Sequence, residues 1–110
     1  MNKSLVLAAL ILFSSQAFAQ APGEAVWIDV RTVGEYEQDH LEGAIRVPWD
    51  GIEKGVAELG LGKDTPIYLY CAVGGRAQKA KERLDALGFT TVTNVGGLAQ
   101  ARELATSVRE

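Results

Sequence analysis

The sequence has 110 residues but only one cysteine, Cys71, and one histidine, His40. A lone cysteine excludes an internal disulfide, and without a Cys-x-x-Cys pair the chain cannot run a thioredoxin-type dithiol mechanism on its own. One cysteine and one histidine also fall short of the ligands of a usual four-ligand zinc site. We therefore expect no metal and no cofactor, and a chemistry that one thiol can perform.

Positive charge is also scarce. Eleven lysines and arginines face fourteen acidic residues, so the net charge is −3, and no basic tract occurs. Nucleic acid and anionic lipid are therefore poor partner candidates. The longest apolar run, residues 5–13, is far shorter than the roughly 20 residues that a bilayer-spanning helix needs.

The N-terminus has the layout of a cleavable export signal. Lys3 supplies positive charge, residues 5–13 are apolar, and Ala17-Phe18-Ala19 provides the small residues of a cleavage site. We predict a signal peptide over 1–19, a single domain over 20–110, a periplasmic location and no stable membrane association after cleavage. The alternative is an uncleaved N-terminal anchor.

Apolar segments with strand character alternate with helical patterns. Strands are expected over 25–30, 44–48, 66–70 and 91–95, and helices over 33–39, 52–59, 77–87 and 98–108. Thr32 and Glu35 form a capping box for the first helix, and Gly96-Gly97 is expected to be a turn. Ala77, Ala80, Leu84 and Leu87 mark the buried face of the third helix. The alternation predicts an α/β fold with a central parallel sheet of about five strands and helices on both faces.

The cysteine occupies an informative position. The apolar run 66–70 leads into Cys71, and Gly74, Gly75 and Arg76 follow before the helical pattern starts. In such a loop the backbone N–H groups converge beside the first side chain, and a helix dipole and an arginine also favour negative charge. We predict that the pKa of Cys71 is lowered and that an anion binds next to it. The alternative is a cysteine buried as a small hydrophobic residue.

Other polar residues fall at the same edge of the predicted sheet, where ligands bind in open parallel α/β folds. Asp29 and Arg31 end the first strand, and a buried Asp29 needs a partner such as Arg31. On the helix after the loop, three further cations either assist an anion or form a solvated face that includes a Lys81–Asp85 pair. These three cations are Lys79, Lys81 and Arg83, and the pattern alone leaves both alternatives open.

Three segments carry a resemblance to a known family. They are residues 27–48, with Trp27-Ile28-Asp29-Val30-Arg31, Glu35-Tyr36, His40-Leu41-Glu42-Gly43-Ala44-Ile45 and Pro48; the loop Cys71-Ala72-Val73-Gly74-Gly75-Arg76; and Asn94-Val95-Gly96-Gly97-Leu98. In this order and spacing, the chain resembles single-domain rhodaneses, which are thiosulfate sulfurtransferases, and among them the small periplasmic phage-shock type. Ala77 stands where the family often has serine, and Ala101 where it often has tryptophan.

The resemblance implies covalent catalysis through a persulfide on Cys71, with sulfur taken from thiosulfate and passed to cyanide or a thiol. It also implies that Asp29, Arg31 and Ala77 support the loop, whereas His40 is expected to be structural. A monomer is favoured. The residues expected to bind the substrate are Ala72, Val73, Gly74, Gly75 and Arg76.

Three other functions stay open at this point. Cysteine phosphatases and arsenate reductases have a similar loop, but with five residues between cysteine and arginine where this chain has four. A rhodanese-like module can also bind a protein partner without catalysis, although such modules usually lack the cysteine. A persulfide carrier would share the chemistry and differ only in its partner.

Overall fold

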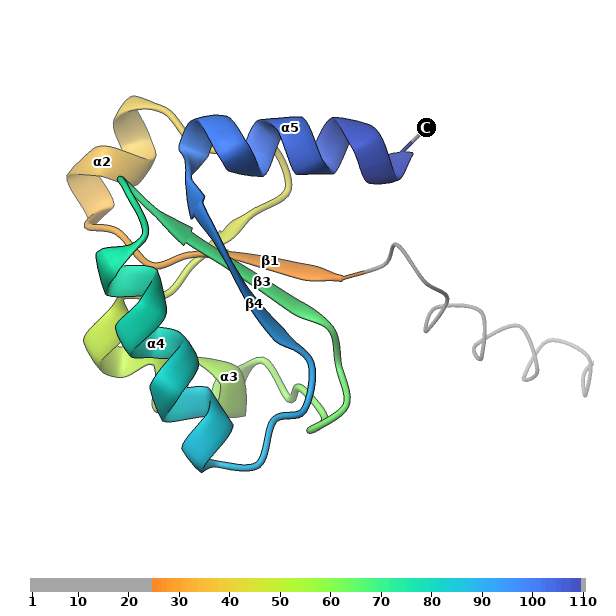
Figure 1. Cartoon of the computed structure of the whole chain (residues 1–110). Helices are drawn as coiled ribbons and strands as arrows, with labels where there is room; N and C mark the ends of the chain where they lie inside the picture. Colours follow the sequence, from red (N-terminus) through yellow and green to blue (C-terminus); the bar gives the residue numbers. More distant parts are fainter. Residues whose placement is uncertain (1–24, 110) are drawn as a thin grey trace, which may run out of the picture.

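The computed structural model describes residues 25–109 (Figure 1). The predicted signal peptide, residues 1–19, lies outside this range, so its cleavage stays a prediction. Within the described part, no helix is both long and apolar enough to cross a membrane.

The described chain forms one parallel sheet whose strands alternate with helices, as the sequence predicts (Figure 1). The sheet has four strands in the order β2-β1-β3-β4, so the expected number of about five is wrong. Each segment with strand character gave one strand, and no other part of residues 25–109 added a fifth. The strands are β1 (Val26–Asp29), β2 (Ile45–Arg46), β3 (Ile67–Cys71) and β4 (Val92–Gly97). The helices are α2 (Val33–Gln38), α3 (Ile52–Glu58), α4 (Gly75–Ala86) and α5 (Leu98–Arg109), with a 3-10 turn, η2 (Trp49–Gly51), before α3.

Helices cover both faces of the sheet, which confirms the predicted layering (Figure 1). Successive strand residues point to opposite faces, so Leu69 and Cys71 pack in the core beneath α3 and α4. Tyr70 points the other way and packs with Ala101 and Ala105 of α5. Cys71 is therefore placed on the α4 face of the sheet, at the carboxyl end of a central strand.

Two local expectations are wrong. Gly96-Gly97 is not a turn but the end of β4, where Gly97 pairs with Cys71 across an irregularity in the ladder. The strand continues because a glycine can approach the neighbouring backbone closely. Leu87 is 43% exposed, whereas Ala77, Ala80 and Leu84 are fully buried as predicted. Leu87 follows the last residue of α4, so it lies beyond the helical face that packs on the sheet.

Tyr70 fixes the connection between α2 and β2 from within the core. Its side chain is fully buried, and its hydroxyl accepts a hydrogen bond from the Leu41 backbone N–H at 3.0 Å. Burial raises the pKa of Tyr70 to about 12. The hydroxyl therefore stays neutral at ordinary pH while it satisfies a buried backbone donor.

Removing this hydroxyl should destabilise the fold. We expect Tyr70→Phe to lower the free energy of unfolding by about 1–3 kcal/mol, because a buried N–H loses its acceptor. Tyr68→Phe on the same strand is the matched control, since Tyr68 is only partly buried, and it should change stability by less. Urea denaturation of both variants measures the difference, and equal effects would contradict the role given to the Tyr70 hydroxyl.

Candidate active site

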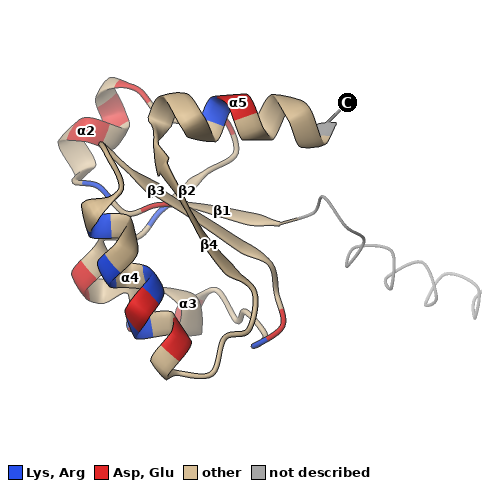
Figure 2. Cartoon of the chain, in the orientation of Figure 1, with Lys and Arg blue, Asp and Glu red and all other residues tan. Residues whose placement is uncertain are grey.

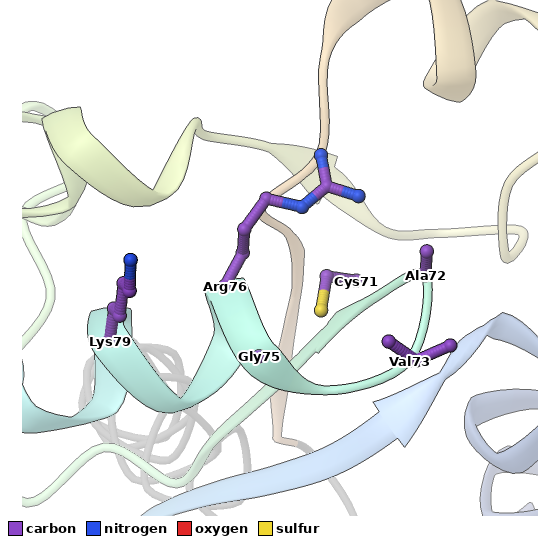
Figure 3. A pocket seen from close by; sticks show the side chains of 6 residues that line it. All are labelled: Cys71, Ala72, Val73, Gly75, Arg76 and Lys79. Carbon is purple, nitrogen blue, oxygen red and sulfur yellow. The ribbon is translucent and has the colours of Figure 1, made fainter.

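The loop between β3 and α4 wraps around the cysteine sulfur (Figure 3). β3 ends at Cys71 and α4 begins at Gly75, so three residues make the whole turn. Gly74 has a φ of 111°, a left-handed conformation that a side chain would disfavour. In this conformation the Gly74 N–H donates a hydrogen bond to Cys71 Sγ at 2.9 Å.

Backbone amides determine the acidity of the thiol. Cys71 is only 1% exposed, and this burial raises the pKa of the thiol. The backbone N–H groups of Ala77, Gly74, Val73 and Arg76 lower it by more, so the pKa lies below its ordinary value. The loop thus stabilises negative charge on sulfur, as its sequence predicts, and the thiolate is the reactive form of cysteine.

A hollow of about 310 Å³ opens above the sulfur (Figure 3). Val73 lies at its rim and is 89% exposed. The hollow therefore joins a buried nucleophile to solvent, with backbone on one side and cations on another. Its lining residues are Cys71, Ala72, Val73, Gly75, Arg76 and Lys79.

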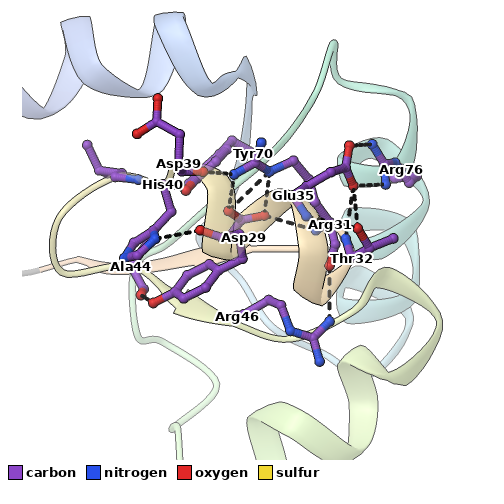
Figure 4. A network of polar contacts seen from close by, with 12 residues as sticks. Asp29, Arg31, Thr32, Glu35, Asp39, His40, Ala44, Arg46, Tyr70 and Arg76 are labelled. Carbon is purple, nitrogen blue, oxygen red and sulfur yellow. Dashed lines mark hydrogen bonds and ion pairs between the residues drawn. The ribbon is translucent and has the colours of Figure 1, made fainter.

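Arg76 lines this hollow, but its guanidinium is held by a carboxylate (Figure 4). Arg76 Nη1 and Nη2 donate to the two oxygens of Glu35 at 2.8 and 3.1 Å. The hydrogen bonds from Arg76, and then those from Thr32, lower the pKa of Glu35 to about 2. The pair joins the first turn of α4 to α2 and offsets part of the charge of Arg76, which also interacts with the charge of the Cys71 thiolate.

Glu35 therefore has two functions, of which the sequence indicated one. The capping box is present, because Thr32 Oγ1 accepts from the Glu35 N–H at 3.2 Å and Glu35 accepts from the Thr32 N–H at 3.0 Å. Its contact with Arg76 joins residues 41 positions apart. Local spacing holds no signal for such a pair.

Asp29 and Arg31 form a buried ion pair at the end of β1 (Figure 4). Arg31 Nη2 lies 2.7 Å from Asp29 Oδ2, and the same nitrogen donates to the Asp39 carbonyl at 2.6 Å. Within the described residues, neither side chain hydrogen-bonds to the 71–76 loop. They instead fix the connection that carries α2, and hence Glu35, so any support they give to the loop passes through this helix.

Asn94 is a supporting residue that the sequence analysis did not single out. Its Nδ2 donates to the Gly74 carbonyl at 3.0 Å, and its Oδ1 accepts from the Gly96 N–H at 2.9 Å. It therefore ties the turn of the loop to β4. The sequence held one signal of this role, because Asn94 is a polar residue within a segment that has strand character. Gly97 adds a second link, because a Cβ there would collide with the Ala72 carbonyl oxygen.

His40 and Lys81 make structural contacts away from the cysteine. The His40 ring stacks on Tyr36 with centroids 3.7 Å apart, and its Nδ1 donates to the Tyr36 carbonyl at 2.7 Å. Lys81 pairs with Asp85 at 2.8 Å. Neither residue lines the hollow.

Arg83 likewise lies away from the hollow, in an ion pair with Glu53 at 3.2 Å. Lys79 is the member of the three cations that lines it. Ala77, at the third position of α4, is fully buried and contributes its N–H to the sulfur. Within residues 25–109, no group of three or more metal-ligating side chains comes together.

Comparison with known proteins points to one family. A model of the rhodanese-like domain matches residues 15–102. Thiosulfate sulfurtransferase PspE of Escherichia coli strain K12 is 37% identical over 98 residues, which are 89% of this chain and 90% of PspE. The putative sulfur carrier protein YrkF of Bacillus subtilis is 35% identical over 68 residues, which are 62% of this chain and 36% of YrkF.

Solved structures give the same result. A structure described as a rhodanese with anions from E. coli superposes with a TM-score of 0.66 at 37% identity, covering 69% of this chain and 89% of that one. A rhodanese-like domain of an Anabaena protein superposes with a TM-score of 0.65 at 28% identity, covering 73% and 92%.

The acidity of the thiol can be measured directly, because Cys71 is the only cysteine. The rate of alkylation by iodoacetamide rises with pH as the thiol loses its proton. We expect the pH of half-maximal rate to be lower in the folded protein than in urea, because the backbone N–H groups surround the sulfur only in the folded protein. Cys71→Ser provides the blank. Equal midpoints would show that burial cancels the effect of the amides.

The contact between Gly97 and the loop gives a second prediction. Gly97→Ala should destabilise the protein by about 1–3 kcal/mol and slow alkylation of Cys71, because the Ala72 carbonyl must move. Gly34→Ala is the control, since a Cβ at Gly34 has nothing within 4 Å. Thermal unfolding and alkylation rates test both variants, and a neutral Gly97→Ala would show that the loop tolerates the shift.

Proposed function

The chain belongs to the rhodanese family, and we propose that it is a sulfurtransferase that takes the outer sulfur of thiosulfate onto Cys71 and passes it to cyanide or a thiol. The observation that carries this proposal is the loop around Cys71. Four backbone N–H groups lower the pKa of a buried thiol that opens to solvent through one hollow. Such a site combines a nucleophile with a place for an anion.

The proposed reaction has two displacements. In the first, the Cys71 thiolate attacks the outer sulfur of thiosulfate, the sulfur–sulfur bond of the donor breaks, and sulfite leaves with the electron pair. In the second, the acceptor attacks the outer sulfur of the Cys71 persulfide, and the thiolate returns. Negative charge stays on sulfur beside Cys71 throughout, so the same amides stabilise the thiolate, the persulfide and the charge that moves between them.

The supporting residues divide into two groups. The backbone N–H groups of Val73, Gly74, Arg76 and Ala77 bind the anionic sulfur, whereas the Arg76 side chain orients the start of α4 through its ion pair with Glu35. The anions named for the similar E. coli rhodanese support an anionic ligand here. We further propose that the protein acts in the periplasm, as a monomer and without a cofactor.

A sulfur carrier is the second candidate, favoured by the similarity to the putative carrier YrkF. It would form the same persulfide but exchange sulfur with a protein. Phosphatase chemistry ranks lower, because only four residues separate Cys71 from Arg76 and the guanidinium is occupied by Glu35. Turnover of an aryl phosphate without sulfur transfer would reverse this order.

Intact mass spectrometry after incubation with thiosulfate tests the proposal. We expect the wild-type protein to gain one sulfur atom, and cyanide to remove it with formation of thiocyanate. Cys71→Ser, which folds around a similar side chain, should gain nothing. If the folded wild-type protein gains no sulfur, the proposed sulfurtransferase activity is contradicted. A persulfide that forms only with a protein donor would favour the carrier.

A further inference from the structure

The cations of the hollow are not equivalent. Arg76 and Lys79 both line it, but Arg76 makes a two-pronged ion pair with Glu35. The carboxylate of Glu35 therefore offsets part of the attraction that Arg76 exerts on a bound anion. For Lys79, the described residues provide no carboxylate within 4.0 Å. Lys79 is therefore the cation of the hollow whose charge no carboxylate of the described residues offsets.

Contacts outside the hollow hold Lys79 in position. It lies one helical turn after Arg76 on α4, and its Nζ is 5.0 Å from the centre of the Trp49 ring. The backbone of Trp49 is held next to the end of β1, because its backbone N–H donates to the carbonyl of Val30, the residue after the strand, at 3.2 Å. The aromatic ring attracts the ammonium without neutralising it. Lys79 thus keeps both a defined place and its full charge.

The neighbouring cations on α4 differ from Lys79 because each pairs with a carboxylate, although Arg83 lies over the same Trp49 ring at 5.0 Å. Figure 2 shows basic segments on the part of α4 nearest the loop, with acidic segments farther along the helix. Lys81 is paired with Asp85 and Arg83 with Glu53. Figure 3 shows Lys79 and Arg76 extending from the same side of the helix, with Arg76 between Lys79 and the Cys71 sulfur in this view. Of these three cations, Lys79 is therefore placed to meet a ligand, whereas Lys81 and Arg83 form ion pairs outside the hollow.

We propose that Lys79 is the specificity-determining residue of this site and selects sulfur donors that carry negative charge at the end remote from the transferred sulfur. This inference rests on the proposed function and names its substrate class. The loop amides bind the sulfur end of the donor next to Cys71, and Lys79 attracts the anionic far end, such as the sulfonate of thiosulfate. A neutral donor of the same size gains nothing from Lys79.

Alkylation of the single cysteine tests this selection without relying on sulfur transfer. Iodoacetate and iodoacetamide attack the same thiolate and differ in charge at the remote end, so the ratio of their rates is independent of the thiolate fraction. We expect Lys79→Met, which keeps most of the apolar stem, to lower the iodoacetate-to-iodoacetamide ratio by roughly tenfold at low salt. Lys79→Arg should restore it.

Lys81→Met is the matched control, because it removes the same charge from the same helix outside the hollow. Its ratio should equal that of the wild type. Added salt should lower the ratio in the wild type but have little effect in Lys79→Met, since an exposed charge is screened. In thiosulfate kinetics, Lys79→Met should raise KM by a similar factor and leave kcat nearly unchanged.

The outcomes separate the inference from the proposed function. A ratio that is unchanged in Lys79→Met, or lowered equally in Lys81→Met, overturns the role of Lys79 whatever thiosulfate does. A ratio lowered only in Lys79→Met supports anion selection, and if the wild type takes no sulfur from thiosulfate, only the proposed reaction fails.

Discussion

The convergence of backbone N–H groups on the Cys71 sulfur is the interaction on which the rest of the site depends. Burial alone would raise the pKa of this thiol, and the amides reverse that effect. Because backbone amides cannot be replaced one by one like side chains, their direction is set entirely by the path of the loop. The left-handed Gly74 ends this path at the start of α4, and Asn94 and Gly97 hold it against β4. The sheet therefore controls the chemistry by fixing the shape of one turn.

Charged side chains around the loop serve mainly to hold its neighbours in place. Asp29 and Arg31 pair in the interior and fix the chain that leads into α2. Glu35 on α2 then takes the guanidinium of Arg76. A buried carboxylate without such a partner would cost free energy, so the pairing explains how Asp29 is tolerated in a core strand. The consequence for binding is that attraction of an anion depends on groups that this network leaves unpaired.

The sequence predicted the features that follow from periodic spacing or from neighbouring residues. It did not predict contacts between residues that are far apart in the sequence. Strand and helix positions followed from apolar spacing, and the position of Cys71 before two glycines indicated a loop with convergent amides. The Glu35–Arg76 pair joins two elements whose spacing in the sequence says nothing of their contact. Glycine pairs usually mark a turn, so the sequence predicts one at Gly96-Gly97, whereas in the structure Gly97 lets β4 approach the loop. Leu87 fits a helical spacing but lies past the point where α4 stops.

The same geometry separates the reactivity of the sulfur from the choice of the sulfur donor. Backbone amides recognise negative charge on sulfur without regard to what is attached to it, so they suit the thiolate and the proposed persulfide equally. Discrimination between donors must then come from side chains at the rim, which can change without disturbing the turn. In this chain two different side chains lie at the rim of the hollow: Val73, which is apolar and exposed, and Lys79, which is charged and lies over the Trp49 ring. The amides would thus set how reactive the sulfur is, and the rim would set which molecule reaches it.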